Sequence, residues 1–443
     1  MFETLKNAFK TKEIRVKIWL TLALILVYRI GCYVPVPTFN AVAMIDSEII
    51  KNSDFLGILN TITGGSMQNA TIFALGVLPF INSSIIMQLL ALVIPALERL
   101  SKEGDEGREK LTQITRIVAI VLAVVQAIGI VVGFKSFIRP IFGFEMNAEG
   151  DPILTMAITI VLLTAGSVMV MWLSERITEY GIGNGTSIII FIGILSTAGT
   201  TLAHNAFPMI GKKWEYIWNL LGFIALVVAI FVFIVFMDGS ERRIAVQYSK
   251  QIKGNKMYGG QTTYIPIRVN GSGVMPIIFA SSLLMFPQMI IQLFFANTDA
   301  AAWYARYMGS GTAVYYVLLA LFILGFSYFY AQIQFNPDDV SRNIQQYGGF
   351  IPGIRAGKPT SDFLRKINNR ITLFGALFLM IISLVPTFLF LALSGQYSDP
   401  QYNLGFASSF SATGLLIVVS VALEINKQLE SQIMMKHYKG FLK

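Results

Sequence analysis

The chain alternates between long apolar runs and short segments that carry most of its charged residues. Each apolar run is roughly twenty residues long, which is the length a helix needs to cross about 30 Å of membrane hydrocarbon. This pattern predicts an all-α membrane protein with ten transmembrane helices. The predicted spans are Ile18–Val36, Thr71–Ile94, Ile117–Gly133, Ile153–Leu173, Thr186–Leu202, Ile217–Met237, Val274–Phe295, Ala313–Gln334, Ile371–Leu393 and Ala407–Ile425.

Lysine and arginine are distributed unevenly among the segments that separate these runs. Ten crossings place both termini and four internal segments on one side, and those six segments hold 27 basic residues against 6 on the other side. Cytoplasmic loops of membrane proteins are enriched in Lys and Arg. We therefore expect both termini to be cytoplasmic. The polar start of the chain lacks a small-residue cleavage site, so the first run is expected to be a retained helix.

Two of the predicted spans contain a short matching motif. Residues 76–84 read GVLPFINSS and residues 273–282 read GVMPIIFASS. The two spans lie five helices apart, and because five is odd, a duplicated five-helix unit would be inverted in the membrane. Proline lacks a backbone N–H, so each helix should bend or begin at the motif. We expect two inverted halves, 1–211 and 212–443, with the functional site at the matched breaks; the alternative is coincidence, because Gly and Pro are common in membrane helices.

The composition narrows the choice of binding partners and sites. Only 13% of the residues are charged and mean hydropathy is +0.63, whereas soluble proteins have about 25% charged residues. The net charge of +9 is explained by basic cytoplasmic loops, although such loops could also dock on ribosomal RNA. The chain has one cysteine, Cys32, and two histidines, His204 and His437. We therefore expect no intrachain disulfide, no metal site and no cofactor.

Ionisable residues are nearly absent from the predicted spans, where Arg29 is the only lysine or arginine inside a run. Ion and solute transporters usually place such residues at the middle of the membrane, and no span supplies a histidine to activate a nucleophile. A transporter and an intramembrane enzyme are both disfavoured, and we expect no enzymatic activity. Asn82 and Gln126 admit two interpretations, interhelical hydrogen bonds or a weakly polar seam between helices that can part. An uncharged path fits an aliphatic gate that excludes water.

Several segments together resemble the SecY family, the channel subunit of the bacterial Sec protein translocase, over nearly the full length. The resemblance implies the SecY channel fold, a bacterial inner (cell) membrane location and a protein-conducting function. The matching segments are RIG at 29–31, VPVP at 34–37, FALG at 73–76, QLL at 88–90, KEG at 102–104, GR at 107–108, ITEYGIGNG at 177–185, ERRI at 241–244, FASS at 279–282, FNP at 335–337 and PGIR at 352–355.

The resemblance further implies an hourglass pore between the two halves, closed by a ring of neutral residues. Two positions depart from the family pattern: Thr186 stands where isoleucine is common, and SATG at 411–414 stands where Gly-Gly-Thr is common. By resemblance the ring consists of Val77, Ile81, Ile190, Ile278, Ile417 and Thr186.

An external segment at about 52–69 resembles the plug that fills the outer funnel of the family's channels. From its residues alone it is a glycine-bearing, weakly amphipathic external loop. The residues assigned to the plug are Phe55, Leu56, Gly57, Ile58, Leu59, Gly64 and Gly65.

Spans two and seven resemble the two faces of a lateral gate, joined by spans three and eight, through which signal sequences and membrane segments leave sideways. The gate residues by resemblance are Asn82, Ser83, Ile86, Gln126, Ser281 and Ser282.

The cytoplasmic segments 238–270 and 335–370 resemble the surface that docks the SecA motor or the ribosome. The alternative for their arginines is ordinary positive-inside charge. The expected partners are SecE, SecG, SecA, the ribosome, polypeptides that carry signal peptides, and membrane lipid. The docking residues by resemblance are Arg242, Arg243, Arg355 and Tyr438.

Overall fold

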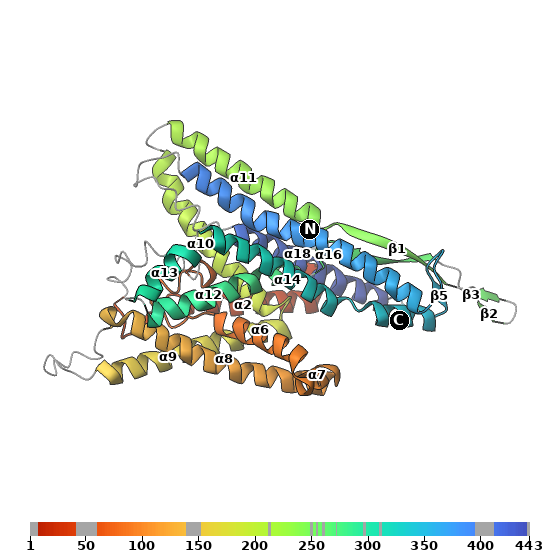
Figure 1. Ribbon diagram of the computed structural model, residues 1–443, viewed down its shortest axis with the longest axis horizontal. Coiled ribbons are helices and arrows are strands. Elements are labelled where there is room, and N and C mark those ends of the chain that lie inside the picture. The colour runs from red at the N-terminus through yellow and green to blue at the C-terminus, as the bar shows by residue number, and fades with distance from the viewer. Residues whose placement is uncertain are drawn as a thin grey trace.

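A computed structural model describes residues 8–40, 60–138, 152–210, 214–248, 251–253, 256–258, 262–271, 273–295, 298–309, 312–394 and 412–440. Every predicted span overlaps a helix, and these helices lie side by side (Figure 1). They are α2 (Lys12–Gly31), α6 (Leu78–Val93), α8 (Asp105–Gly133), α9 (Pro152–Tyr180), α10 (Gly185–Ile210), α11 (Trp214–Asp238), α12 (Met275–Phe294), α14 (Ala313–Gln334), α16 (Lys358–Ser394) and α18 (Ala412–Gly440).

Not all of these helices are long and apolar enough to cross a membrane when each is judged alone. Among the described residues, four helical segments meet that requirement: Asp105–Gly133, Ile153–Tyr180, Ala313–Gln346 and Lys358–Val385. Helix α6 and the short α7 (Pro95–Lys102), bent by 107°, together could make a fifth span. Further apolar helices, in α10, α11 and α12, are shorter over their described stretches.

Helices α6 and α12 begin in the same way at the two matching motifs. The N-cap residues Val77 and Val274 have nearly equal dihedrals, φ −91° and ψ 1° against φ −90° and ψ −9°. Each N-cap follows a glycine with positive φ, +55° at Gly76 and +62° at Gly273, a conformation that residues with a Cβ adopt reluctantly. The motif proline then occupies the first turn, where its missing N–H has no helical partner to lose. The expectation that a helix begins at each motif is confirmed.

The helices pack around one buried apolar core that joins both predicted halves. In the N-terminal half α6 packs on α8, α8 on α9, and α9 on α2 and α10. In the C-terminal half α12 packs on α14, α14 on α16, and α18 on α16 and α11. The halves meet where α12 contacts α6 and α8, and again where α10 contacts α11 and α18. The two matching helix starts therefore lie at the boundary between the halves.

The segments 238–270 and 335–370 do not remain simple loops, as the sequence pattern suggested, but fold together into a small unit. Strand β1 (Glu241–Tyr248) pairs antiparallel with β4 (Thr262–Arg268) on one side and with β5 (Gly349–Phe350) on the other. Strands β2 (Gln251–Lys253) and β3 (Lys256–Tyr258) form a separate hairpin.

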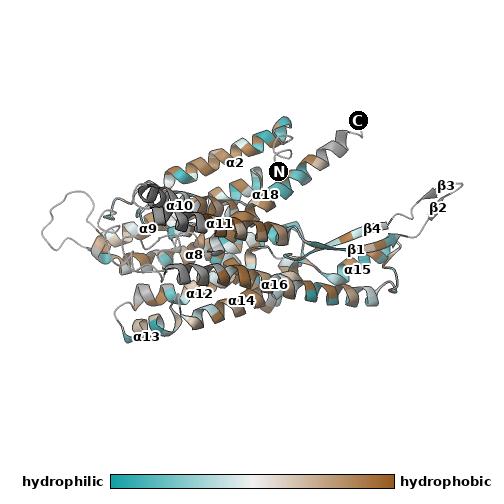
Figure 2. Ribbon diagram, turned by 90° about the horizontal axis from the view of Figure 1, so that it is seen from above, coloured by the Kyte–Doolittle hydropathy of each residue, from teal (hydrophilic) through white to brown (hydrophobic). Residues whose placement is uncertain are grey.

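This sheet has a core of its own beneath α15 (Pro337–Gln346) and the start of α16. Strand side chains alternate between two faces, so Ile244 and Val246 point to one face together, and Ile267 of β4 joins them. Buried residues of the second segment complete the core, including Ile344 and Leu364. The sheet projects from one end of the bundle, the end at which α2 begins, and β1 is largely hydrophilic (Figure 2).

Candidate functional site

The five aliphatic ring residues taken from the resemblance come from four helices and are all buried. Val77 caps α6 and Ile81 lies in its first turn, while Ile278 lies in the first turn of α12. With Ile190 of α10 and Ile417 of α18 they are between 2% and 8% exposed and belong to one apolar cluster. The matched helix starts thus place aliphatic side chains of both halves in a common core.

A cavity of about 520 Å³ lies against this cluster. Ile81, Ile190 and Ile278 all line it, so three ring residues from three helices meet at one surface. Val77 and Ile417 belong to the apolar cluster but are not among the cavity's lining residues. The cavity therefore has an aliphatic end formed by both halves of the chain.

Thr186 lines the same cavity but makes polar contacts. Its Oγ1 lies 3.1 Å from Oγ of Ser174, and its backbone N–H donates to Oδ1 of Asn184 at 3.0 Å. The side chain is half-buried, one helical turn before Ile190. Thr186 thus occupies the polar wall of the cavity, next to its aliphatic end.

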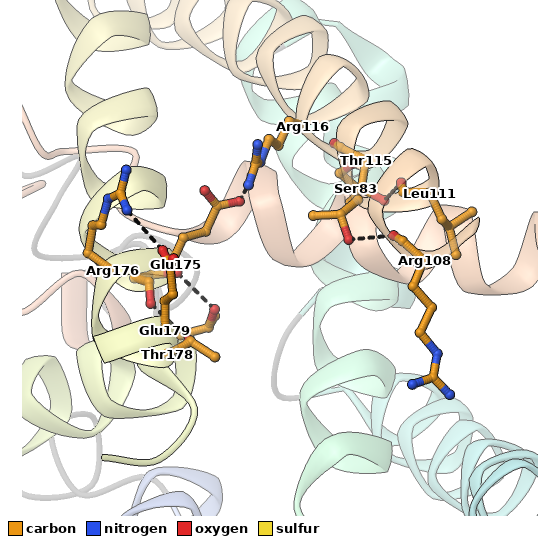
Figure 3. A network of polar contacts seen from close by, with 12 residues as sticks. Ser83, Arg108, Leu111, Thr115, Arg116, Glu175, Arg176, Thr178 and Glu179 are labelled. Atoms are coloured by element: carbon orange, nitrogen blue, oxygen red, sulfur yellow. Dashed lines mark hydrogen bonds and ion pairs between the residues drawn. The ribbon is translucent and has the colours of Figure 1, made fainter. Parts of the chain in front are cut away.

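The polar wall carries charges that are paired with one another (Figure 3). Nε of Arg116, on α8, donates to Oε1 of Glu175, on α9, at 2.7 Å. Glu179 also lines the cavity and pairs with Arg176 at 2.9 Å. Among the described residues no group of histidine, cysteine and carboxylate side chains could hold a metal ion. The charged side chains of this wall are thus paired with neighbouring charges of opposite sign.

Gln88 and Tyr330 join the two halves beside this cavity. The Tyr330 hydroxyl, on α14, donates a hydrogen bond to Oε1 of Gln88, on α6, and Nε2 of Gln88 donates to Oγ of Ser84 at 3.1 Å. This hydrogen bond links residues 8–210 to residues 214–440. The Tyr330 ring packs on Phe279 of α12, with ring centroids 5.1 Å apart.

The sequence did not indicate the roles of Tyr330 and Phe279, because each looked like one more aromatic residue of an apolar span. Gln88 was recognised only as the first residue of a matching segment, QLL at 88–90. Polar atoms in an otherwise apolar span were the available signal for this contact.

The gate residues taken from the resemblance have varied surroundings. Oγ of Ser83 donates to the Thr115 carbonyl at 2.6 Å, so this side chain joins α6 to α8 within one half (Figure 3). Ser281 donates to the carbonyl of Ile278 on its own helix at 3.0 Å. The others divide by burial: Gln126 and Ser282 are buried, and Asn82 and Ile86 are half-buried.

Only the end of the plug segment falls within the described residues. Phe55, Leu56, Gly57, Ile58 and Leu59 lie outside them, whereas Gly64 and Gly65 are described.

Gly64 is held between two helices. Nη1 of Arg29, on α2, donates to the Gly64 carbonyl at 3.2 Å. A Cβ on Gly64 would lie 2.9 Å from Cα of Gly193, on α10. The one basic residue of the predicted spans therefore contacts the described end of the plug segment.

The docking arginines lie on the sheet unit and are exposed. Arg242 and Arg243 are on β1, and Arg243 pairs with Glu241 at 2.7 Å. Arg355 projects from a turn between Gly353 and Gly357, whose φ values are +85° and +97°. Tyr438 lies in α18, and its side chain is outside the described residues.

Hydrogen bonds between α15 and α16 hold the Arg355 turn in place. Ser361 donates to Oδ1 of Asp338, and Nη2 of Arg365 lies 2.9 Å from its Oδ2. The Ser361 hydrogen bond, with the charges of Arg365 and Arg342, holds the pKa of Asp338 below its usual value. Thr360 donates to the Arg355 carbonyl at 2.8 Å. These contacts present Arg355 on a fixed turn.

Comparisons with known proteins agree with this architecture. The SecY family model matches residues 71–426. The chain is 41% identical over 455 residues to the protein translocase subunit SecY of Streptomyces coelicolor and 38% identical over 448 residues to that of Bacillus subtilis, and each alignment covers all of both chains.

Solved channel structures share the fold at low sequence identity. A structure of a protein-conducting channel has a TM-score of 0.61 at 19% identity, covering 94% of this chain and 91% of the other. Sec61 in the canine ribosome-channel complex has a TM-score of 0.57 at 18% identity, with the same coverage. These structures have the ten-helix channel fold, which confirms the predicted fold class.

Proposed function

The chain belongs to the SecY family of protein-conducting channel subunits, and we propose that its polypeptide cargo crosses the membrane between Ile81, Ile190 and Ile278. The cavity with its aliphatic end is the observation that carries this proposal. Neutral branched side chains can exclude water and part around varied residues without binding any of them tightly. Val77 and Ile417, in the same cluster, complete the ring, and Thr186 lies at its polar edge.

In this proposal the closed ring is supported by the end of the plug segment. The Arg29 hydrogen bond to the Gly64 carbonyl fixes the base of that segment.

A sideways exit requires the two halves to part along the seam where α12 faces α6 and α8. The Tyr330–Gln88 hydrogen bond links the halves, taken as 1–211 and 212–443, beside this seam. Separation would break this hydrogen bond and expose apolar surface, which a passing membrane segment or lipid can cover.

The exposed arginines of the sheet unit are proposed to bind the partner that drives translocation. The chain itself performs no chemistry in this account, so the SecA motor or the ribosome must drive movement from the side where the sheet projects. Canine Sec61 and yeast Ssh1 have been determined bound to ribosomes, which supports such docking here. We expect SecE and SecG as partner subunits, surrounding membrane lipid, a bacterial inner-membrane location and cytoplasmic termini.

Site-specific crosslinking to an arrested cargo tests the ring. Cys32 is replaced by serine, single cysteines are placed at Ile81 or Ile278, and a secretory polypeptide carrying a thiol-reactive probe is stalled in transit. Crosslinks should form at both positions. The matched control is a cysteine at Val317 of α14, a hydrophobic residue that is 65% exposed. Equal crosslinking at Val317 would refute the proposed path.

A further inference from the structure

Helix α13 (Asp299–Met308) is a short helix at the end of the bundle opposite the sheet (Figure 1). It connects α12 to α14 and contacts both of them. Figure 2 shows it at the edge of the molecule beside α14. It thus borders the surface of one of the proposed gate helices.

The side chains of α13 divide between a protein-facing flank and an exposed aromatic flank. Tyr304 is 8% exposed, whereas Trp303 is 57% and Tyr307 is 48% exposed. Trp303 and Tyr307 are four residues apart, on one helix face, and their ring centroids are 5.5 Å apart. Asp299 and Arg306, two turns apart, share the polar face.

The aromatic flank adjoins an exposed apolar surface. Four residues separate the end of α13 from α14, which carries an exposed apolar stripe of Val314, Val317 and Leu321. In a membrane protein such a stripe faces hydrocarbon, and tryptophan and tyrosine concentrate at the boundary between hydrocarbon and headgroups. Trp303 and Tyr307 lie where such a boundary is expected.

Arg306 adds a charge that suits the headgroup layer. Its guanidinium lies 5.8 Å from the centre of the Tyr307 ring, and no ion pair joins it to an acidic side chain in the described part of the chain. Guanidinium groups bind phosphate in a bidentate manner. We propose that α13 is an interfacial anchor, with Trp303 and Tyr307 inserted at the headgroup boundary and Arg306 bound to phospholipid phosphate.

The anchor is coupled to both adjoining helices. Oγ1 of Thr312 donates to the carbonyls of Tyr307 and Gly309, at 3.2 and 2.9 Å, and accepts from the backbone N–H of Tyr315 at 3.2 Å. Oγ1 of Thr298 donates to the Phe295 carbonyl, at the end of α12, at 2.7 Å. This inference rests on the proposed role of α12 in the gate. The anchor would hold the outer end of α12 at a constant depth in the membrane while the inner part of α12 moves.

Tryptophan fluorescence in vesicles measures the depth of α13 directly. The full chain keeps Trp303 as its only tryptophan, with phenylalanine at the four other positions, Trp19, Trp172, Trp214 and Trp218. It is reconstituted with phosphatidylcholine and phosphatidylglycerol brominated either near the head or near the end of the acyl chain. We expect stronger quenching by bromine near the head. The proposal would be overturned if Trp303 were quenched only by aqueous iodide, or by neither iodide nor brominated lipid. Stronger quenching by bromine near the end of the acyl chain than by bromine near the head would also overturn it.

The arginine is tested in the same vesicles. Arg306→Glu should reduce quenching by head-region bromine about twofold, because the side chain would be repelled by phosphate. The wild-type Arg306 should give the same quenching with phosphatidylcholine alone, since both lipids carry phosphate, and should be insensitive to free inorganic phosphate. Loss of quenching on adding free phosphate would instead assign Arg306 to a soluble anion and overturn its part in the anchor.

A second pair of variants avoids dependence on the four phenylalanine replacements. With Cys32 replaced by serine, spin labels are attached to cysteines at Ala300, exposed on the aromatic side, or at Ala302, exposed beside the polar face. Oxygen dissolved in lipid should relax the Ala300 label more than the Ala302 label, and equal relaxation would contradict the proposal. Neither measurement depends on translocation, so failure of the anchor and failure of the channel function give separate results.

Discussion

Removing the Tyr330 hydroxyl should loosen the seam between α6 and α14. Tyr330→Phe deletes the hydrogen bond to Gln88 while keeping the ring contact with Phe279, whose centroid lies 5.1 Å away. Hydrogen bonds between membrane helices contribute about 0.6 kcal/mol on average and up to about 1.7 kcal/mol. The ratio of parted to closed seams should therefore rise by about threefold to about eighteenfold.

Distance measurements between spin labels can count the parted population. With Cys32 replaced by serine, labels are placed at Leu90 on α6 and Ile333 on α14, both exposed. Tyr330→Phe should increase the long-distance population. Tyr328→Phe is the matched control, because its hydroxyl lies on the same helix and bonds the Asn369 carbonyl within the C-terminal half.

A double-mutant cycle separates the hydrogen bond from any change in packing. In a Gln88→Leu background, Tyr330→Phe should have little further effect, because the bond is already absent. An equal shift in both backgrounds, or a shift of the same size for Tyr328→Phe, would refute the assignment of the seam to this bond.

Three further changes test other parts of the account. Gly64→Ala should lower the free energy of unfolding of the purified chain by at least about 1 kcal/mol, since its Cβ would meet atoms at 2.9 Å. Gly65 also has a positive φ, but the nearest atom to its Cβ would lie at 3.9 Å, so Gly65→Ala should cost less. Equal losses for the two variants would contradict the close packing at Gly64. Arg355→Glu should slow motor-driven export several-fold without changing membrane insertion. Arg15 is an exposed residue of α2, and Arg15→Glu should leave export unchanged. Unchanged export with Arg355→Glu would remove the docking role. The pKa of Asp338 is lowered in the folded state. The ionised Asp338 carboxylate therefore stabilises the fold above the ordinary aspartate pKa of about 4, and this stabilisation is lost as pH falls through the pKa of the folded state. The protection factors of residues 352–360, which are exchange rates corrected for the intrinsic pH dependence of amide exchange, should therefore fall below about pH 4. Asp338→Asn should lower these protection factors at both neutral and acid pH, and protection factors that do not change with pH would count against the α15–α16 contacts.

The bundle could be predicted from sequence because its signals are local and repeated. Each span is a long apolar run, and each Gly-Val-x-Pro motif combines a residue that tolerates positive φ with one that fits the first turn of a helix. These signals do not depend on which helices become neighbours. The bend or helix start predicted at each motif follows from these signals, and the helices begin at Leu78 and Met275.

The sheet unit was missed because its signal is short and divided between distant segments. Ile244 and Val246 alternate with polar residues over only a few positions, in a segment that reads as a basic loop. Their core partners Ile344 and Leu364 lie about a hundred residues further along the chain. Neither segment can bury its apolar residues without the other, so neither shows a strand pattern that is convincing alone.

The contacts of the candidate site depend on packing between the halves. The positions of the aliphatic ring came from the family resemblance, and the structure places three of them around one cavity. Tyr330 and Gln88 are 242 residues apart in the chain, and no sequence pattern joins them. Such a pair can be recognised only when α6 and α14 are seen together.

The central claim is that a polypeptide passes between Ile81, Ile190 and Ile278. The most direct measurement is an electron cryomicroscopy structure of the chain with its partner subunits and a secretory polypeptide arrested in transit. The account predicts density for the polypeptide continuing from the cavity past these three side chains, with α6 and α12 moved apart. Density for the polypeptide along the lipid-facing surface, with the three isoleucines still in contact, would contradict it.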